Sequence, residues 1–289
     1  MQVRAITSGL TSRLRRYQRF NSCNFVQTLY DLRHTRAMLT EQRKQHILAV
    51  LKRDGRVVAK TLGQELGLSE DTIRRDLREL ARAGLLQRVH GGALPASPAV
   101  ATLNVREHLC ATEKIALGRA AARLIRPGQL VFVDGGTTTQ QLVRHLPAGL
   151  RATIVTHSPI IAAELAEQPE IEVVLIGGRL YKHSMVSVGA AAVEAIGRIR
   201  ADLYLMGITG LHAEAGLSTG DLEEAYIKRA LMAQAAETVA LASSDKLGRA
   251  SAYCIAPVTA LTSLLVSTQA DEAAVAPLRA LGLQVDRAD

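Results

Sequence analysis

The sequence contains few cysteines, and their spacing does not suit a disulfide framework or a zinc site. Cys23, Cys110 and Cys254 are an odd number, lie far apart and include no CxxC pair. Disulfide-stapled domains usually carry an even number of cysteines, and structural zinc sites bring theirs close together in sequence. Both classes are therefore disfavoured, and we expect a protein of the reducing cytoplasm.

Long apolar runs and nucleotide-binding fingerprints are missing as well. No stretch reaches the roughly 18 residues that a membrane helix needs, and the N-terminus lacks the continuous apolar core of a secretory signal. The sequence also lacks the P-loop with its lysine and the GxGxxG dinucleotide motif. We therefore expect a soluble protein that has no membrane contact, no metal and no cofactor.

Positive charge is abundant, but it is unevenly distributed. The 289 residues carry a formal net charge of +8, of which residues 1–39 contribute +6, residues 40–95 contribute +4 and residues 96–289 contribute −2. Only the middle segment is both basic and regularly patterned, so nucleic-acid contact is expected there. A protein that compacts nucleic acid nonspecifically is disfavoured, because the long third segment is close to neutral.

The first 39 residues form an arginine-rich extension without a sustained hydrophobic period. Three interpretations compete, namely a disordered tail that attracts nucleic acid, a transit peptide, and a misassigned start of translation. Regular patterning begins abruptly at Thr40. We therefore favour translation from Met38, which would leave residues 1–37 untranslated.

Residues 69–93 predict an amphipathic helix with a defined start. Ser69 can accept a hydrogen bond from a free backbone N–H group and so cap the helix. Ile73, Leu77 and Leu80 recur at helical spacing and line one face. The other face is mostly arginine, with Asp71, Arg75, Arg78 and Arg82 near its centre and Thr72 and Arg74 at its edges.

Elements on both sides of this helix complete a winged helix-turn-helix over residues 40–95. Two further helices are expected before it, over residues 40–53 and 60–66, with Gly67 in the turn that follows them. A strand over residues 85–89 and the Gly91-Gly92 turn predict the hairpin of the wing. Residues 94–103 contain two prolines and several small side chains, and residues 96–104 are therefore expected to be a linker.

Residues 105–289 alternate helices with short apolar strands, which predicts a larger, mostly parallel α/β domain. Strands are expected over residues 130–133, 153–155, 172–176, 203–206, 238–242, 264–267 and 284–285. Helices are expected over residues 114–125, 139–145, 158–167, 190–199 and 223–236, with another between the last two strands.

Polar runs follow several of these strands, and ligands of open α/β sheets bind at that edge. Residues 134–139 join a strand to a helix, where backbone N–H groups and threonine hydroxyls can cradle a phosphate. An ordinary strand-to-helix turn explains the same residues equally well. Lys246 can face a phosphate as a point charge. Glu224 and Lys228 lie four apart on a helix, where a solvated ion pair is the simpler interpretation.

The sequence resembles the DeoR family of bacterial transcription regulators from about Thr40 to the C-terminus. SEDTIRRDLRELARAGLLQRVHGGA is similar to the helix-turn-helix and wing of that family. EKIALGRAAARLI, DGGTTT, VTHS, LIGG, VGAAA, ADLYLMGITG, EEAYIKRA and SSDKLGR follow in the order of its sensor domain. The chain departs from the family pattern at Gly135 and His157.

The resemblance implies a repressor of carbohydrate or polyol metabolism genes that binds operator DNA and is relieved by a phosphorylated sugar or polyol. It implies a sensor domain similar to ribose-5-phosphate isomerase, over residues 105–289. An isomerase-like enzyme with an appended DNA-binding domain is the alternative, although we expect no enzyme and no catalytic residue. Self-association as a dimer or larger oligomer is also expected, because helix-turn-helix proteins normally bind paired half-sites.

Two sets of site residues follow from the resemblance and from the chemistry of the side chains. The effector-binding set comprises Asp134, Gly136, Thr137, Thr138, Thr139, Gly177, Gly178, Glu224, Lys228 and Lys246. The DNA-binding set comprises Ser69, Thr72, Arg74, Arg75, Arg78, Arg88 and His90. The helical members of the second set are expected in the major groove, and the two wing residues on phosphates.

Overall fold

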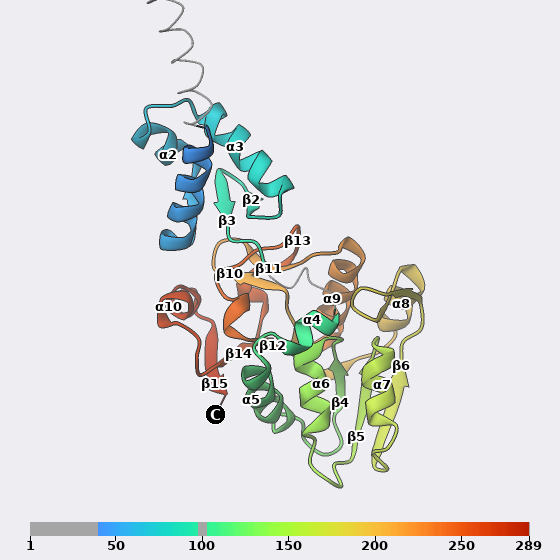
Figure 1. Cartoon of the computed structure of the whole chain (residues 1–289). Coiled ribbons are helices and arrows are strands. Elements are labelled where there is room, and N and C mark those ends of the chain that lie inside the picture. The colour runs from blue at the N-terminus through green and yellow to red at the C-terminus, as the bar shows by residue number, and fades with distance from the viewer. Residues whose placement is uncertain (1–39, 98–102, 289) are drawn as a thin grey trace, which may run out of the picture. The chain divides into compact units, whose positions relative to one another are not determined.

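The computed structural model describes residues 40–97 and 103–288 (Figure 1). The predicted extension over residues 1–39, including a start at Met38, lies outside the described residues, as do residues 98–102 of the predicted linker. The chain divides into two units after Asp54, and each is described by itself.

The described part of the first unit is a helix over residues 40–54. Ile47, Val50 and Leu51 are buried, and Leu48 is half-buried, so one face is apolar. The observed helix is one residue longer than predicted.

The chain after Gly55 folds first into a pair of helices and a small antiparallel sheet. The elements are β1 (Val57–Val58), α2 (Ala59–Glu65), α3 (Glu70–Arg82), β2 (Gln87–Val89) and β3 (Gly92–Leu94), with strand order β1-β3-β2. Gly91 has a φ of +76°, and a Cβ atom at Gly92 would lie 1.8 Å from the carbonyl oxygen of Val57. Both positions of the predicted hairpin turn therefore require glycine.

Seven parallel strands form the centre of the remaining chain. They are β4 (Leu130–Val133), β5 (Ala152–Thr156), β6 (Ile171–Leu175), β9 (Ala201–Gly207), β12 (Ala235–Ala242), β14 (Ser263–Ser267) and β15 (Gln284–Ala288). Their order in the sheet is β15-β14-β12-β9-β4-β5-β6, and every neighbouring pair is parallel. The predicted α/β class with a mostly parallel sheet is confirmed.

Helices cover both faces of this sheet. They are α4 (Leu103–His108), α5 (Ala111–Ala122), α6 (Thr137–Arg144), α7 (Pro159–Leu165), α8 (Ala190–Ile196), α9 (Leu222–Gln234) and α10 (Glu272–Ala280). Helices α5, α6 and α7 lie side by side (Figure 1) and share one core with Val131 and Val133 of β4. Phe132, between those two valines, packs into the core that contains α8, α9 and α10. Burial on both faces explains why the central strands are continuously apolar.

Five short strands that were not predicted build two small sheets. β7 (Arg179–Tyr181) pairs with β8 (Val186–Val188), and β11 (Gly216–Thr219) lies between β10 (Gly210–His212) and β13 (Tyr253–Ala256). Helix α4 was not predicted either, and it begins inside the expected linker of residues 96–104. Single turns of 3-10 helix occur at Ser244–Lys246 and Val258–Ala260.

The described ranges contain neither a membrane-spanning helix nor a cluster of metal ligands. None of their helices is both long and apolar enough to cross a membrane. Their histidine, cysteine, aspartate and glutamate side chains form no group of three or more that could hold a metal ion.

Candidate functional site

The candidate ligand site lies where the order of the strands reverses. β4 is flanked by β5 on one side and β9 on the other, and the chain fills first one half of the sheet and then the other. The loops that follow two such strands separate and leave a crevice at the carboxyl edge of the sheet. Residues 135–139 after β4 and residues 207–209 at the end of β9 line a pocket at this point.

A buried carboxylate, that of Asp134, joins the ends of the strands beside this pocket. The side chain is only 1% exposed. The backbone N–H of Gly135 donates to Oδ1 at 2.9 Å, and His157 Nε2 contacts the same oxygen at 2.8 Å. The backbone N–H of Gly207 donates to Oδ2 at 2.9 Å, and Lys228 Nζ donates to it as well. A carboxylate accepts about four hydrogen bonds, so the capacity of Asp134 is filled by the protein.

Charge keeps this carboxylate ionised. Burial by itself raises the pKa of Asp134, but the charge of Lys228 and the hydrogen bond and charge of His157 outweigh burial and hold the pKa at about 2. His157 Nδ1 lies 3.0 Å from the carbonyl oxygen of Ser187. Both ring nitrogens of His157 therefore face acceptor oxygens.

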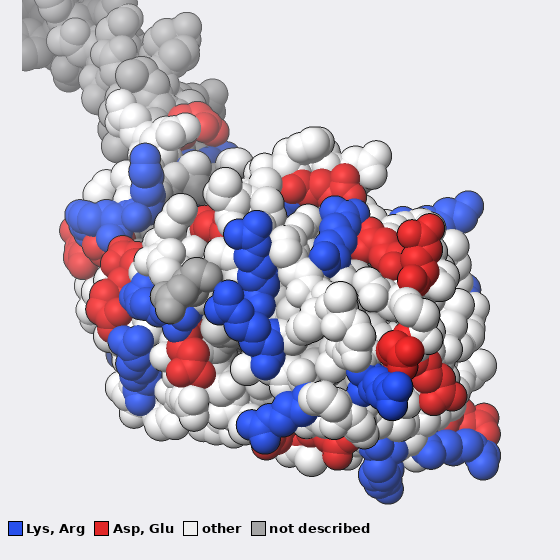
Figure 2. All heavy atoms as spheres, turned by 90° about the horizontal axis from the view of Figure 1, so that it is seen from below, with Lys and Arg blue, Asp and Glu red and all other residues white. Residues whose placement is uncertain are grey.

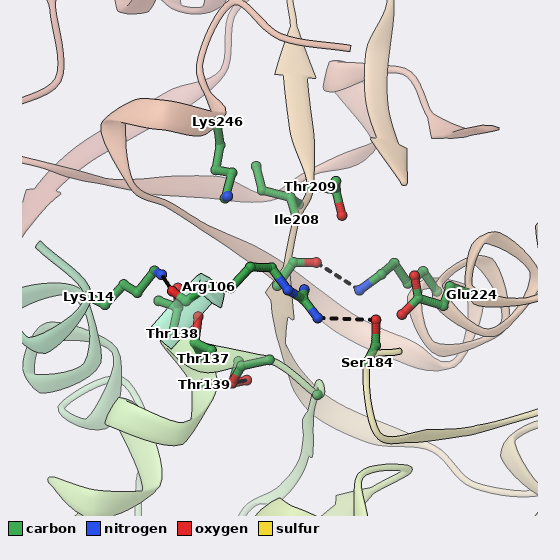
Figure 3. Close-up of a pocket in the computed structure, with 14 residues that line it drawn as sticks. Arg106, Lys114, Thr137, Thr138, Thr139, Ser184, Ile208, Thr209, Glu224 and Lys246 are labelled. Atoms are coloured by element: carbon green, nitrogen blue, oxygen red, sulfur yellow. Dashed lines mark hydrogen bonds between the residues drawn. The ribbon is translucent and has the colours of Figure 1, made fainter. Parts of the chain in front are cut away.

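The pocket contains more positive than negative side chains. It is lined by Arg106, Lys114, Gly135, Gly136, Thr137, Thr138, Thr139, Ser184, Gly207, Ile208, Thr209, Glu224, Lys228 and Lys246 (Figure 3). Lys228 is neutralised by Asp134, and Lys246 Nζ lies 2.7 Å from a carboxylate oxygen of Asp245. Arg106 and Lys114 form no ion pair with any residue of the described ranges. The lining therefore favours an anionic ligand.

Lys114 is a buried cation, with only 3% of its surface exposed. Burial lowers its pKa, and the nearby charge of Lys246 lowers it further, to about 8, although Asp245 opposes the shift. Its Nζ donates a hydrogen bond to the backbone carbonyl of Arg106. An anion in the pocket would stabilise the charged form of Lys114 and raise its pKa again.

The start of α6 supplies backbone donors to the same pocket. Gly136 precedes the helix with a φ of +139° and offers no side chain to cap it. Thr137, Thr138 and Thr139 form the first turn, whose backbone N–H groups have no intrahelical partner. The hydroxyl of Thr139 donates to the carbonyl oxygen of Gly136 at 2.9 Å. A helix N-terminus of this kind binds phosphate or carboxylate groups well.

Glu224 is the one carboxylate among the residues that line the pocket. It accepts a hydrogen bond of 2.9 Å from Thr219 Oγ1, and Figure 3 shows it on the opposite side of Arg106 from Lys114. The predicted alternative of a solvated Glu224–Lys228 ion pair is wrong. Lys228 is buried and donates instead to Asp134 and, at 2.8 Å, to the carbonyl oxygen of Gly207.

The structure brings together most of the predicted effector residues, though not all. Those that line the pocket are Gly136, Thr137, Thr138, Thr139, Glu224, Lys228 and Lys246. Asp134 lies behind Lys228 and does not line the pocket, because its oxygens are bonded internally. Gly177 and Gly178 do not line it either. A Cβ atom at Gly178 would lie 2.8 Å from the carbonyl oxygen of Val188, so close packing against β8 accounts for this glycine.

Sequence reasoning missed the cations that come from the segment before β4. Arg106 lies on α4 and Lys114 on α5, and neither follows a strand. Ser184 comes from the turn between β7 and β8, two strands that were not predicted. Only the resemblance, through the EKIALGRAAARLI stretch, pointed to the neighbourhood of Lys114.

Helix α3 has the start and the faces that the sequence predicted. The side chain of Ser69 accepts a hydrogen bond of 3.2 Å from the backbone N–H of Thr72. Ile73, Leu77 and Leu80 are buried, so the arginine face is left exposed. An exposed, arginine-rich helix of this kind suits the major groove of DNA.

The basic side chains of this region differ in how they are bound. Arg74 pairs with Glu70 at 2.6 Å on the helix surface. Arg75 and Arg78 are exposed and form no ion pair with the residues that the structure describes, and Arg88 and His90 of the wing are exposed as well. Elsewhere acidic and basic groups are interspersed, as Figure 2 shows for one face of the molecule.

Two family models match the chain. The DeoR-like helix-turn-helix domain matches residues 43–98, and the DeoR C-terminal sensor domain matches residues 109–268. Together these matches include the arginine-faced helix and all the loops that line the pocket.

Several named transcriptional regulators are similar in sequence over most of the chain. The HTH-type transcriptional regulator GlpR of Haloferax volcanii is 39% identical over 74% of this chain and 84% of its own length. The HTH-type transcriptional repressor GlcR of Bacillus subtilis is 32% identical over 82% and 92%. The glycerol-3-phosphate regulon repressor of Escherichia coli is 31% identical over 73% and 84%.

A solved structure, the sorbitol operon regulator SorC from Klebsiella pneumoniae, is 15% identical over 80% of this chain and 96% of its own, with a TM-score of 0.38. Ribose 5-phosphate isomerase A from Methanocaldococcus jannaschii is 15% identical over 47% and 54%, with a TM-score of 0.35. The two matching domains and the relatives of more than 30% identity show that the chain belongs to the DeoR family of DNA-binding transcriptional regulators.

Proposed function

We propose that the protein represses genes of carbohydrate or polyol metabolism and that a phosphorylated sugar or polyol releases it from its operator. The observation that carries the proposal is the charge of the pocket. Arg106, Lys114, Lys228 and Lys246 converge on the free N-terminus of α6, while only two of the four are neutralised by a carboxylate. A phosphate dianion supplies the missing negative charge.

The opposite side of the pocket suits hydroxyl groups. Glu224 can accept hydrogen bonds from a polyol, and Ser184 and Thr209 can donate or accept them. We infer that the phosphate lies toward Lys114 and Lys246 and the hydroxyls toward Glu224. The named function of one relative, repression of a glycerol-3-phosphate regulon, supports an effector of this class.

On the DNA side, we propose that α3 reads bases and that the wing binds the backbone. Arg75 and Arg78 can each donate two hydrogen bonds to a guanine, and Thr72 can contact a thymine methyl or a phosphate. The Glu70–Arg74 pair is exposed and weak, so Arg74 can exchange this partner for DNA. Ser69 at the helix start, and Arg88 and His90 on the wing, would contact phosphates.

Release follows from linkage between the two sites. An effector that binds the DNA-incompetent arrangement more tightly than the competent one shifts the population away from the operator. The effector changes DNA affinity by the same factor by which DNA changes effector affinity. We expect a homodimer or larger oligomer to be the DNA-binding species.

Catalysis is the rival function, and the bonding of the carboxylates disfavours it. A sugar-phosphate isomerase needs a carboxylate that can reach a substrate proton. Asp134 is fully bonded within the protein, and Glu224 accepts from Thr219. Turnover of ribose 5-phosphate by the purified protein would overturn the assignment as a non-enzyme.

The experiment is a thermal-shift screen combined with gel shifts on an operator selected from random DNA. Glycerol 3-phosphate, glucose 6-phosphate and fructose 1-phosphate are compared with the same compounds without phosphate. A ligand at 100 times its dissociation constant adds about 2.7 kcal/mol to the free energy of unfolding. We expect one phosphorylated compound to do so and to release the operator.

Two variants with the same charge change control this screen. Lys246→Gln removes a cation that lines the pocket, and Lys182→Gln removes an exposed one that does not. We expect only the first to lose the ligand response. A protein that responds equally to phosphorylated and unphosphorylated sugars, or an unchanged response in Lys246→Gln, would refute the proposed phosphate site.

A further inference from the structure

Arg106 leaves much of its hydrogen-bonding capacity unused. Its Nη2 lies 3.3 Å from Ser184 Oγ and 3.4 Å from the carbonyl oxygen of His183, which are long contacts. Its Nε is buried and has no hydrogen-bond partner. Burial lowers the pKa of the guanidinium, and the charge of Glu224 opposes that shift. A buried donor without an acceptor is costly, and the planar fork of a guanidinium matches an oxyanion.

Helix α4, which carries Arg106, makes few other contacts with the rest of the protein. Of the six residues of α4, only Leu103 is buried and Arg106 half-buried, while the other four are exposed. The carbonyl oxygen of Arg106 accepts the hydrogen bond from Lys114 Nζ. A helix of six residues has little stability of its own, so its position depends on these contacts. Two of the three side chains that hold α4, Arg106 and Lys114, line the pocket.

The place of α4 in the sequence gives these contacts a further meaning. It is the first described helix after β3, the last strand of the wing, and it begins directly after residues 98–102 of the predicted linker. The chain after the wing is attached first through Pro95 and Ser97, which pair with Ala250, and α4 is the next attachment along the chain. A change in how firmly α4 is held therefore changes how firmly the segment between the wing and α5 is anchored.

We propose that Arg106 binds an oxyanion of the effector and that this contact fixes α4. Occupancy of the pocket would thereby be communicated to the DNA-binding domain through the helix that follows the linker. The inference rests on the proposed function, to which it adds the residue and the route. The effector gains its contact with Arg106 only when α4 is in place, so binding favours that arrangement over one in which α4 is released.

The first part of the test is affinity. Calorimetry compares the wild type with Arg106→Gln, Arg106→Lys and the matched control Glu107→Gln, which changes an exposed side chain on the same helix. The probes are glycerol 3-phosphate, glucose 6-phosphate and inorganic phosphate. We expect affinity for the tightest probe to fall ten- to a hundred-fold in Arg106→Gln, to fall less in Arg106→Lys, and to stay unchanged in the control.

The second part is hydrogen exchange with the pocket saturated. In the wild type the probe should slow exchange of the amides of residues 103–108 and of residues 137–139. In Arg106→Gln at saturating probe, we expect protection of residues 137–139 but not of α4, and we expect the operator to stay bound. A melting curve for each variant establishes that it is folded, and Arg106→Lys keeps the charge if the glutamine variant is not.

The outcomes separate this inference from the proposed function. If the wild type binds no phosphorylated probe, both fail. If the wild type binds one and Arg106→Gln binds it within twofold, only the role of Arg106 is refuted. If Arg106→Gln binds more weakly but α4 is still protected at saturation, Arg106 contacts the effector without fixing the helix, and the proposed route is refuted.

Discussion

At the scale of single residues, Asp134 was predicted to bind the effector, but its hydrogen bonds give it a structural function. It holds Lys228 in the pocket, and it joins Gly135 after β4, His157 after β5 and Gly207 at the end of β9. Gly135 and His157, the two positions at which a departure from the family pattern was expected, both contact it. A Cβ atom at Gly135 would lie 2.2 Å from Val186 Cγ1, so the contact with β8 excludes a larger residue there.

The first prediction concerns the stability that Asp134 provides. Replacing Asp134 with asparagine leaves Lys228 buried without a counter-charge, which typically costs about 3–5 kcal/mol. Urea unfolding followed by circular dichroism measures the loss. Asp286→Asn is the control, because Asp286 is exposed on β15, and a surface change should stay within about 0.5 kcal/mol. Equal effects of the two substitutions would contradict the prediction.

The ionised carboxylate of Asp134 also makes the stability of the fold depend on pH in the acid range. The pKa of Asp134 is about 2 in the folded protein and 3.8 in its ordinary state, so the fold favours the ionised form. Its contribution to stability is complete above about pH 4 and is lost as the pH falls from there toward 2.

The second prediction uses the lowered pKa of Lys114. Below about pH 8 this lysine is already charged, so an anionic effector binds without taking up a proton. Above about pH 8 binding must recharge it, and affinity should fall by up to tenfold per pH unit. The phosphate is a dianion throughout, since its second pKa is near 6. The free energy of unfolding has the opposite pH dependence. The pKa of Lys114 is about 8 in the folded protein and 10.5 in its ordinary state, so the unfolded chain binds more protons between these values and the fold gains stability as the pH rises through them.

Calorimetry between pH 7 and 9.5 measures this dependence, and buffers of different ionisation enthalpy report the proton taken up. Lys114→Met is the matched variant. It should bind more weakly at pH 7 and show a flat profile through pH 8–9, so a slope that persists in this variant would assign the proton to another group.

At the scale of elements, we expect α3 to recognise the bases of the operator and the wing to bind its phosphate backbone. The third prediction is that Arg75→Ala costs about 1–3 kcal/mol of operator binding and relaxes the base preference, because it removes hydrogen bonds to a base edge. Arg88→Ala should weaken binding evenly across sequences and reduce its salt dependence. Gel shifts over a series of operator variants distinguish the two, and an even loss for Arg75→Ala would exclude base readout by that residue.

The central elements were predictable because their signals are local. Ser69 is a typical N-cap residue directly before an amphipathic pattern, so the start of α3 could be predicted. β4 was predicted with its observed limits because its four apolar residues lie between a turn and a polar loop. The phosphate-binding loop could be located in the same way, since it follows directly from that strand. Helix α6 begins two residues earlier than expected, with Thr137, since threonine is a weak indicator of helix inside a turn.

The rest of the site depends on contacts between distant segments. Arg106 and Lys114 reach the pocket from helices that precede β4, and no spacing in the sequence relates them to Lys246. The strands β7 and β8 have three residues each, which is too short for an alternating pattern to be recognised, so their pairing is decided by the fold. The failure of the predicted Glu224–Lys228 pair has the same origin, because the buried Asp134 attracts Lys228 more strongly than a neighbour on its own helix does.

At the scale of the whole molecule, the fourth prediction concerns assembly on DNA. Helix-turn-helix dimers bind half-sites whose centres lie about 34–36 Å apart, or one turn of DNA. Inserting five base pairs between the half-sites of the selected operator turns one of them to the opposite face and should abolish tight binding. Inserting ten should restore part of it. Sedimentation analysis measures the oligomer directly, and binding that tolerates the five-base-pair insertion would exclude a rigid dimer.

The position of the pocket at the reversal of strand order also affects how fast proteases degrade the protein. Its lining comes from α4, α5 and α9, from the loops after β4, β9 and β12, and from the turn between β7 and β8. One small molecule would therefore connect both halves of the sheet. Neither half could open fully without losing the ligand. Opening that exposes cleavage sites is suppressed in proportion to occupancy when the ligand binds only the folded state. Proteases should therefore degrade the occupied regulator more slowly than the empty one, so that abundance as well as DNA affinity responds to the sugar.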